Sequence, residues 1–446
     1  MIPRSVHVIT PDGVGIYYQT FGTGPTRLVY LTRLGQSIGY IWEIPLYARF
    51  LARLGAVAEV MVLDVRGTGF ADRILPDDRS LALEARVTDV LAALDDAGWS
   101  SANVLGVEDG GSLAAVLAAL HPDRVDGLLL YGTSARGSWA EDYPFGWPRD
   151  EWDSFIEDVM KARHTWEWAL AQMELLAPSH MDDEELLRRM VTLYLMGGST
   201  VSLWEIQRDL DIRGVLGAIQ APTLVIDRRD NNIETIAEGD YLAERIPGAR
   251  RVVVDGRDFE VFAGDQDALL EQLIGFIGGG QKHAASTRVL TTVLFTDIVD
   301  STRLVRELGD VAWSRRVATH HAAVRRVLAD YGGREVDTAG DGFFATFDGP
   351  ARAAQAALRI GDAVRLEADL DVRAGVHTGE VELMDGQVRG VAVHVGARVC
   401  ALAGPRQVLA TGIVRDLTAG SGLTFSDQGV HELKGFDDPV RLFEVG

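Results

Sequence analysis

Short apolar runs alternate with amphipathic helical patterns along the first part of the chain, from Val6 to about Ile277. The strand-like runs lie at Arg27–Leu31, Val60–Asp64, Asn103–Gly106, Gly127–Tyr131, Thr223–Ile226 and Arg251–Val254. Strands that alternate with helices are typical of a parallel sheet covered by helices on both faces. The pattern therefore predicts a doubly wound α/β fold here.

Strand patterns stop between about residues 134 and 218, where helical patterns rich in tryptophan take over. The tryptophans are Trp139, Trp147, Trp152, Trp166, Trp168 and Trp204. We interpret this segment as a helical cap inserted over the C-terminal edge of the sheet, where ligands bind in such folds.

A glycine-rich stretch at 278–287 breaks the periodicity and predicts a flexible linker. A different rhythm follows over 288–446. The expected elements are a strand at Val289–Asp297, a long helix at Thr302–Tyr331, a hairpin around Glu335 and Phe343–Phe347, a helix at Ala351–Glu367 and a strand at Val372–Val376. This order predicts a separate α+β domain.

Charge and cysteine content narrow the function. The 446 residues include 65 Asp and Glu against 43 Lys and Arg, a formal charge of −22. Nucleic acid is therefore not expected as a partner, since binding it requires excess basic charge. The single cysteine, Cys400, excludes an intrachain disulfide and a cysteine zinc cluster. No apolar run is long enough to span a membrane, and we expect a cytoplasmic protein.

Two aspartates are the first candidates for chemistry. Asp297 ends an apolar strand, and Asp341 lies between two glycines in the predicted hairpin. Carboxylate oxygens beside backbone carbonyls suit Mg²⁺ or Mn²⁺, which take further ligands from substrate phosphates. Basic residues are also available: Arg373 and Lys434 have glycines close by in sequence, and Arg398 follows four residues after a histidine.

Five motifs together make residues 288–444 resemble the catalytic domain of class III nucleotidyl cyclases. They are FTDI, the GDG hairpin, RAGVHTGE, AVHVGAR and HELKG, in that order. The resemblance implies a ferredoxin-like α+β fold that converts ATP or GTP to the 3′,5′-cyclic nucleotide and pyrophosphate. It also implies a head-to-tail homodimer, with two Mg²⁺ or Mn²⁺ ions per site held by Asp297, Asp341 and the Ile298 carbonyl.

The same resemblance assigns further roles, and it shows three departures. Arg373 and Lys434 match the triphosphate-binding positions, and Arg398 matches the arginine that stabilises the transition state. His394 replaces the family's asparagine, which acts beside that arginine. Asp337 and Gln387 replace the lysine and aspartate with which adenylyl cyclases read the purine. Since an acidic group suits the N–H donors of guanine, the choice between ATP and GTP stays open.

The first part of the chain resembles an α/β hydrolase with a helical cap. The resemblance rests on Asp64–Asp72, the elbow-like Gly106–Gly111 and Ala221–Ile226. The nucleophile position of the elbow is Glu108, the triad acid falls on Asp230, and Phe259 stands where the histidine is expected. Without imidazole there is no general base, so we predict an inactive triad. A capped pocket that senses a small apolar ligand is the expected role.

Two other interpretations are kept. The substitutions at His394, Asp337 and Gln387 also fit a pseudoenzyme that binds nucleotide and ligand without turnover. The N-terminal resemblance leaves open an esterase with a regulatory cyclase-like domain.

Overall fold

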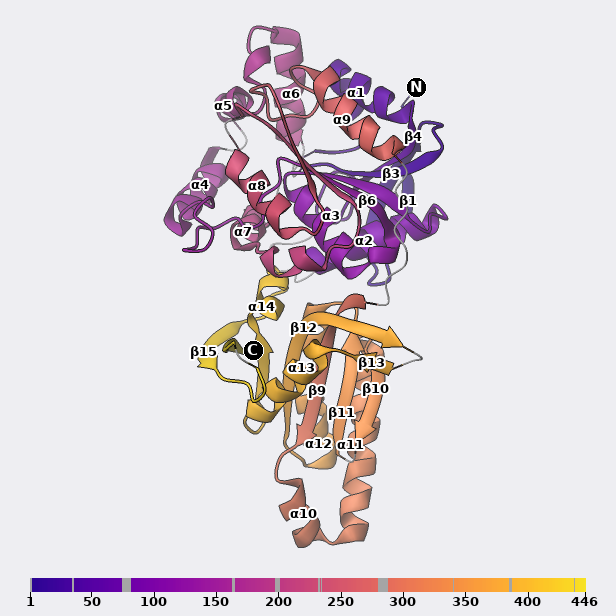
Figure 1. The fold of residues 1–446 in the computed structure, drawn as a ribbon, viewed down its shortest axis with the longest axis vertical. Coiled ribbons are helices and arrows are strands. Elements are labelled where there is room, and N and C mark those ends of the chain that lie inside the picture. Colours follow the sequence, from indigo (N-terminus) through magenta and orange to yellow (C-terminus); the bar gives the residue numbers. More distant parts are fainter. Residues whose placement is uncertain are drawn as a thin grey trace. The chain divides into compact units, whose positions relative to one another are not determined.

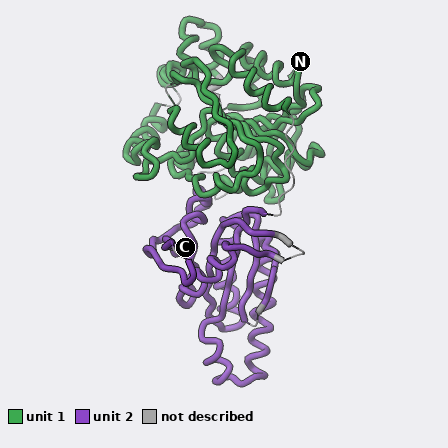
Figure 2. The backbone as a smooth tube through the Cα atoms, viewed as in Figure 1, with its two compact units in different colours: residues 1–285 green, residues 286–446 purple. Residues whose placement is uncertain are grey.

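The computed structural model describes residues 2–33, 36–73, 82–162, 165–196, 201–231, 233, 235–279, 288–339, 341–384, 387–436 and 438–446. The chain folds as two compact units, residues 1–285 and 286–446 (Figure 2). Of the linker predicted at 278–287, Gly278 is the last residue of a helix, whereas 280–287 lie outside the described residues. Within these ranges, no helix is both long and apolar enough to cross a membrane.

The first unit is built on a sheet of eight strands, in the order β1-β2-β4-β3-β5-β6-β7-β8 (Figure 1). The strands from β3 onward are parallel, while β2 runs antiparallel to both β1 and β4. Their bounds are β1 Val6–Ile9, β2 Gly15–Phe21, β3 Thr26–Leu31, β4 Ala58–Asp64, β5 Ala102–Val107, β6 Val125–Tyr131, β7 Thr223–Arg228 and β8 Arg250–Val254.

Helices cover both faces of this sheet, which confirms the doubly wound fold. Helices α1 (Pro45–Gly55) and α9 (Gln266–Gly278) pack on one face, where Leu105 and Leu129 belong to the same buried cluster as Leu51 and Leu270. Helices α2 (Leu83–Asp96), α3 (Asp109–Leu120) and α8 (Ile236–Arg245) cover the other face (Figure 1).

In the described part of the segment between β6 and β7, where the cap was predicted, the structure has four α-helices. They are α4 Arg149–Ala162, α5 Trp166–Leu176, α6 Glu184–Met196 and α7 Val201–Asp209. Trp152 and Trp204 are buried in a cluster with Ile156 and Val159, so they hold cap helices together. Trp139 and Trp147, by contrast, are 52% and 44% exposed.

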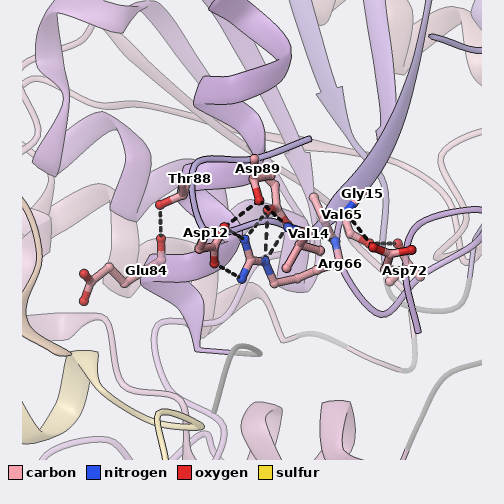
Figure 3. A network of polar contacts seen from close by, with 11 residues as sticks. Asp12, Val14, Gly15, Val65, Arg66, Asp72, Glu84, Thr88 and Asp89 are labelled. Atoms are coloured by element: carbon pink, nitrogen blue, oxygen red, sulfur yellow. Dashed lines mark hydrogen bonds and ion pairs between the residues drawn. The ribbon is translucent and has the colours of Figure 1, made fainter. Parts of the chain in front are cut away.

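A buried arginine fixes the edge of this sheet (Figure 3). Arg66 is fully buried just after β4, and its Nη2 donates to Asp89 Oδ1 of α2 at 2.7 Å. Its Nη1 donates to Asp12 Oδ2, in the turn between β1 and β2, also at 2.7 Å. A buried charge is tolerated only when it is paired. Arg66 therefore ties the β1–β2 hairpin to α2, a structural role for the motif around it.

The second unit contains a sheet in the order β10-β11-β9-β12-β14-β16-β15, with β13 paired to β12. Among the strand pairs formed by the described residues, only β12 and β14 run parallel. The bounds are β9 Arg288–Ile298, β10 Arg334–Ala339, β11 Gly342–Phe347, β12 Val372–Met384, β13 Gln387–Arg389, β14 Val408–Thr411, β15 Phe425–His431 and β16 Val440–Val445.

Helices cover this sheet too, which confirms an α+β domain. Helices α11 (Asp310–Asp330) and α12 (Pro350–Ala368) pack on the face that carries Leu294. Helix α13 (Val391–Leu402) packs on the opposite face, where Ala392 contacts Val293, and α14 (Gly412–Leu417) follows β14.

The single long helix predicted for 302–331 is wrong. The structure divides it into α10 (Ser301–Leu308) and α11 at Gly309, which ends α10 with a φ of 75°. A backbone angle of this sign is readily adopted only by glycine, so the chain turns at this residue.

Candidate active site

Strand alternation places Asp297 and Arg373 on the same face of the second sheet. On β9, Val293 packs with α13 and Leu294 with α11 and α12, so Asp297 lies on the α13 face. Arg373 of β12 is directly opposite Asp297 in the antiparallel register. The α13 face of β12 is also where Gly375 lies, and a Cβ there would come 2.2 Å from the backbone nitrogen of Cys400. Glycine thus lets α13 approach β12 closely.

The two side chains form an ion pair. Arg373 Nη2 lies 2.6 Å and Nε 3.1 Å from Asp297 Oδ2, and the side chains are 32% and 36% exposed. The third guanidinium nitrogen, Nη1, donates to the carbonyl oxygen of Ala401 in the last turn of α13, at 3.2 Å. Arg373 therefore links a candidate metal ligand to the helix that carries His394 and Arg398.

This pair borders a cleft of about 590 Å³. Its lining consists of Asp297, Ile298, Arg373 and the segment that begins α10, namely Asp300, Ser301, Thr302, Arg303, Arg306 and Glu307. The N-terminal end of a helix favours anions, because its first N–H groups lack intrahelical acceptors. These α10 residues were not predicted from the sequence motifs. The end of strand β9, followed closely by the start of helix α10, is the sequence feature that could have indicated them.

Asp341 lies in the turn before β11 and does not line this cleft. Its Oδ2 is buried and has no hydrogen-bond partner among the described residues. Phe343, two residues later, is paired with Thr296, so Asp341 lies near the end of β9. Fully buried His320 of α11 is close by; burial lowers its pKa to about 4, an effect that its neighbour Asp341 opposes. His320 was not predicted as a site residue from the sequence.

Asp297, Ile298 and Asp341 offer carboxylate and carbonyl oxygens, the atoms that bind a divalent cation. Within the described part of the chain, no group of three His, Cys, Asp or Glu side chains is arranged for a metal. Asp297 and Ile298 nevertheless border one cleft, and the unpartnered oxygen of Asp341 is a buried carboxylate acceptor beside the same strand end. Such a donor set suits Mg²⁺ or Mn²⁺ with water and phosphate as remaining ligands.

The other predicted residues lie outside this cleft. His394 and Arg398 are exposed on α13, Lys434 is exposed after β15, and Asp337 is exposed on β10, where the register with β11 shifts. The backbone of Gln387 begins β13, and its side chain is not among those described. The structure therefore brings together Asp297, Ile298 and Arg373 at one cleft, whereas Asp337, His394, Arg398 and Lys434 are exposed outside it.

The hydrolase-like elbow keeps its geometry in the first unit. Glu108 lies between β5 and α3 with a φ of 53°, a strained conformation for a residue with a side chain. Burial raises the pKa of its carboxyl to about 7; Arg33 opposes this shift, while Asp109 and Glu260 add to it.

The positions expected for the other two triad members carry no imidazole. Phe259 is 1% exposed, and its ring centroid lies 6.2 Å from that of Tyr131. Asp230 is exposed in the turn after β7, where its N–H donates to the Gly256 carbonyl.

A buried ion pair and a very small cavity occupy this edge of the sheet. Arg33 Nε donates to Glu260 Oε1 at 2.7 Å, and Gln36 Nε2 donates to Glu260 Oε2 at 3.0 Å. The cavity that Arg33 and Gln36 line with Asp109 measures about 20 Å³, room for about one water molecule.

The strained elbow and the doubly wound sheet make the first unit hydrolase-like, and the second unit is a separate domain with a cleft beside Asp297 and Arg373. A family model described as alpha/beta hydrolase fold matches residues 32–263, and one described as adenylate and guanylate cyclase catalytic domain matches residues 285–443. The chain belongs to the α/β hydrolase fold family, and its residues 285–443 match the adenylate and guanylate cyclase catalytic domain.

Two relatives match the chain over part of its length. A pimeloyl-acyl-carrier-protein methyl ester esterase of Neisseria meningitidis is 28% identical over 236 residues, which cover 52% of this chain and 86% of the esterase. An uncharacterized protein of Mycobacterium tuberculosis is 33% identical over 161 residues, 36% of this chain and 42% of that protein.

Solved structures show the same fold for the first unit. A hydrolase from Pseudomonas aeruginosa has a TM-score of 0.53 at 24% identity and covers 62% of this chain and 98% of its own. An esterase from Exiguobacterium antarcticum has a TM-score of 0.54 at 21% identity, with 62% and 100% covered. Adenylate cyclases from Trypanosoma brucei match 35% of this chain and 89% of their own, at 25% identity and a TM-score of 0.33.

Proposed function

We propose that the C-terminal unit is a nucleotidyl cyclase that converts ATP or GTP to the 3′,5′-cyclic nucleotide and pyrophosphate. The observation that carries this proposal is the pairing of Asp297 with Arg373 at the border of a cleft, inside a segment that matches the cyclase catalytic family. One residue can hold a metal ion and the other can bind phosphate, so the cleft offers both groups that a metal-bound triphosphate needs.

Each residue of the cleft has a task in this proposal. Asp297, Asp341 and the Ile298 carbonyl would hold two Mg²⁺ or Mn²⁺ ions. These ions would neutralise negative charge on the triphosphate and lower the pKa of the attacking 3′-hydroxyl. Arg373 binds the β- and γ-phosphates through its planar fork of N–H donors. The first turn of α10 accommodates the negative end of the triphosphate.

A homodimer would complete the site. His394, Arg398, Asp337 and Lys434 are exposed and lie outside the metal cleft. In a head-to-tail dimer, each cleft would receive these groups from the other subunit, with Arg398 placed at the phosphate where charge develops. A monomer would then hold only half of each site.

Asp337 bears on the choice of base. Its exposed carboxylate can accept hydrogen bonds from the N1–H and N2–H₂ groups of guanine, whereas N1 of adenine needs a donor. The proposal therefore includes GTP as a substrate beside ATP.

The N-terminal unit is proposed to regulate rather than to hydrolyse. Phe259 provides no base, and Arg33 and Glu260 fill the edge of the sheet beside Glu108. The expected sensing of a small apolar ligand gains no support from this cavity of about 20 Å³, since a ligand would have to open it.

The test is a direct assay of the purified full chain with Mn²⁺ or Mg²⁺ and either ATP or GTP, from pH 5 to 9. We expect cyclic product from at least one nucleotide and a loss of at least about 100-fold in Asp297→Ala. Product that persists undiminished in that variant would refute the site. Tight nucleotide binding with no product under either metal would instead establish the pseudoenzyme. A p-nitrophenyl ester screen, with Glu108→Ala as its control, tests for esterase activity, and we expect none.

A further inference from the structure

Arg373 has more than one acceptor in the second unit. Its guanidinium binds Asp297 through two nitrogens and the Ala401 carbonyl through the third. The carboxylate of Asp297, directly across the sheet, gives Arg373 a second partner besides a phosphate. Arg373 is thus placed to affect the candidate metal ligand Asp297 as well as the substrate.

We propose that Arg373 couples the binding of the divalent cation to the binding of the triphosphate, by competing with the free cation for Asp297 and by moving to phosphate when both arrive together. This inference rests on the proposed function, because it takes the triphosphate as the ligand of this cleft. It assigns Arg373 a second role, as a positioning residue for the metal.

The competition follows from charge and geometry. Asp297 Oδ2 receives both N–H groups of Arg373, so a cation that binds this oxygen must displace them or share the oxygen with a like charge. The pair is about one third exposed, which leaves it open to exchange rather than locked in the core. Arg373 therefore lowers the affinity of Asp297 for a free cation.

Binding of a triphosphate removes the competition between Arg373 and the cation for Asp297. Phosphate oxygens offer Arg373 a bidentate partner, so the arginine can leave Asp297 without losing its hydrogen bonds. Asp297 is then available to the cation that arrives with the phosphates. Cation and triphosphate should consequently bind with positive coupling, and each should raise the affinity of the other by the same factor.

The cleft provides a matched control. Arg303 lines the same cleft, but its guanidinium pairs with Asp300 at 3.3 Å and with Glu307 at 3.1 Å. Replacing Arg303 removes one positive charge from the cleft and leaves the partner of Asp297 in place. The comparison of Arg303→Gln with Arg373→Gln separates a specific competition from a general change in charge.

The experiment measures Mn²⁺ binding to the full chain by electron paramagnetic resonance, with and without the α,β-methylene analogues of ATP and GTP. We expect Arg373→Gln to bind free Mn²⁺ at least about fivefold more tightly than the wild type, and to lose most of the tightening that the analogue produces. Arg303→Gln should change free Mn²⁺ affinity by less than about twofold. A purely structural role of Arg373 predicts weaker Mn²⁺ binding in Arg373→Gln, both with and without the analogue. Tighter binding of free Mn²⁺ in this variant therefore distinguishes the proposed competition from a structural role.

Circular dichroism and thermal unfolding check that each variant folds. If Arg373→Gln does not fold, Arg373→Lys tests the same point, because a lysine keeps the charge but not the fork, and it should reduce the coupling at least about threefold. Unchanged or weaker free Mn²⁺ binding in Arg373→Gln, or equal effects of Arg303→Gln, would overturn the inference. Absence of cyclic product in the wild type would refute the cyclase while leaving this binding test intact.

Discussion

Arg33 and Glu260 form an ion pair of 2.7 Å between side chains that are only 5% and 3% exposed, at the edge of the sheet where hydrolases of this fold place their catalytic groups. Glu260 directly follows Phe259, which stands where the catalytic histidine is expected. This edge of the sheet is thus a charge-compensated part of the core.

Removing one partner of this pair should destabilise the first unit strongly. We expect Glu260→Leu to lower the free energy of unfolding by about 3–5 kcal/mol, because it leaves Arg33 buried without its counter-ion. The exposed pair of Arg53 and Asp267 is the control, and Asp267→Ala should cost less than about 1 kcal/mol. Urea unfolding followed by tryptophan fluorescence reports on this unit, since Trp313 is the one tryptophan outside it. A loss below 1 kcal/mol in Glu260→Leu would contradict the prediction.

Glu108 should make the stability of the same unit depend on pH. Its pKa is raised to about 7 mainly by burial, so the folded state favours the protonated carboxyl. The stabilisation is complete below the ordinary pKa of about 4.5 and is lost as the pH rises through about 7. We expect Glu108→Gln to raise the free energy of unfolding at pH 8 by up to roughly 3 kcal/mol and to change nothing at pH 4.5. Equal stability of both proteins at pH 8 would show that Glu108 ionises freely.

Asp337 should set the preference between the two purines. Asp337→Lys supplies a donor for N1 of adenine and removes the acceptor for guanine, so we expect the ratio of kcat/KM for ATP over GTP to rise at least about tenfold. Asp330→Lys makes the same change of charge at an exposed position near the end of α11 and should leave the ratio within about twofold. If the two variants shift the ratio equally, Asp337 does not read the base.

The sequence predicted the elements better than the contacts between them. Apolar alternation located β9 and β12, but their register, which sets Asp297 opposite Arg373, depends on how whole strands pair. The long helix failed at Gly309, because a single positive φ overrides a continuous helical pattern. The pair of Arg33 and Glu260 joins positions 227 residues apart, and no local pattern marks either residue as buried.

The most direct test of a cyclase with shared sites is complementation between two inactive variants. Asp297→Ala would remove the metal side of each site and Arg398→Ala the transition-state side, so each alone should lose at least about 100-fold in activity. Co-expressed with different affinity tags, the two would form heterodimers with one intact site each. We predict that the mixture regains about a quarter of wild-type activity, since half of the dimers are mixed and each of these carries one of two sites. A mixture no more active than its components would contradict the shared site.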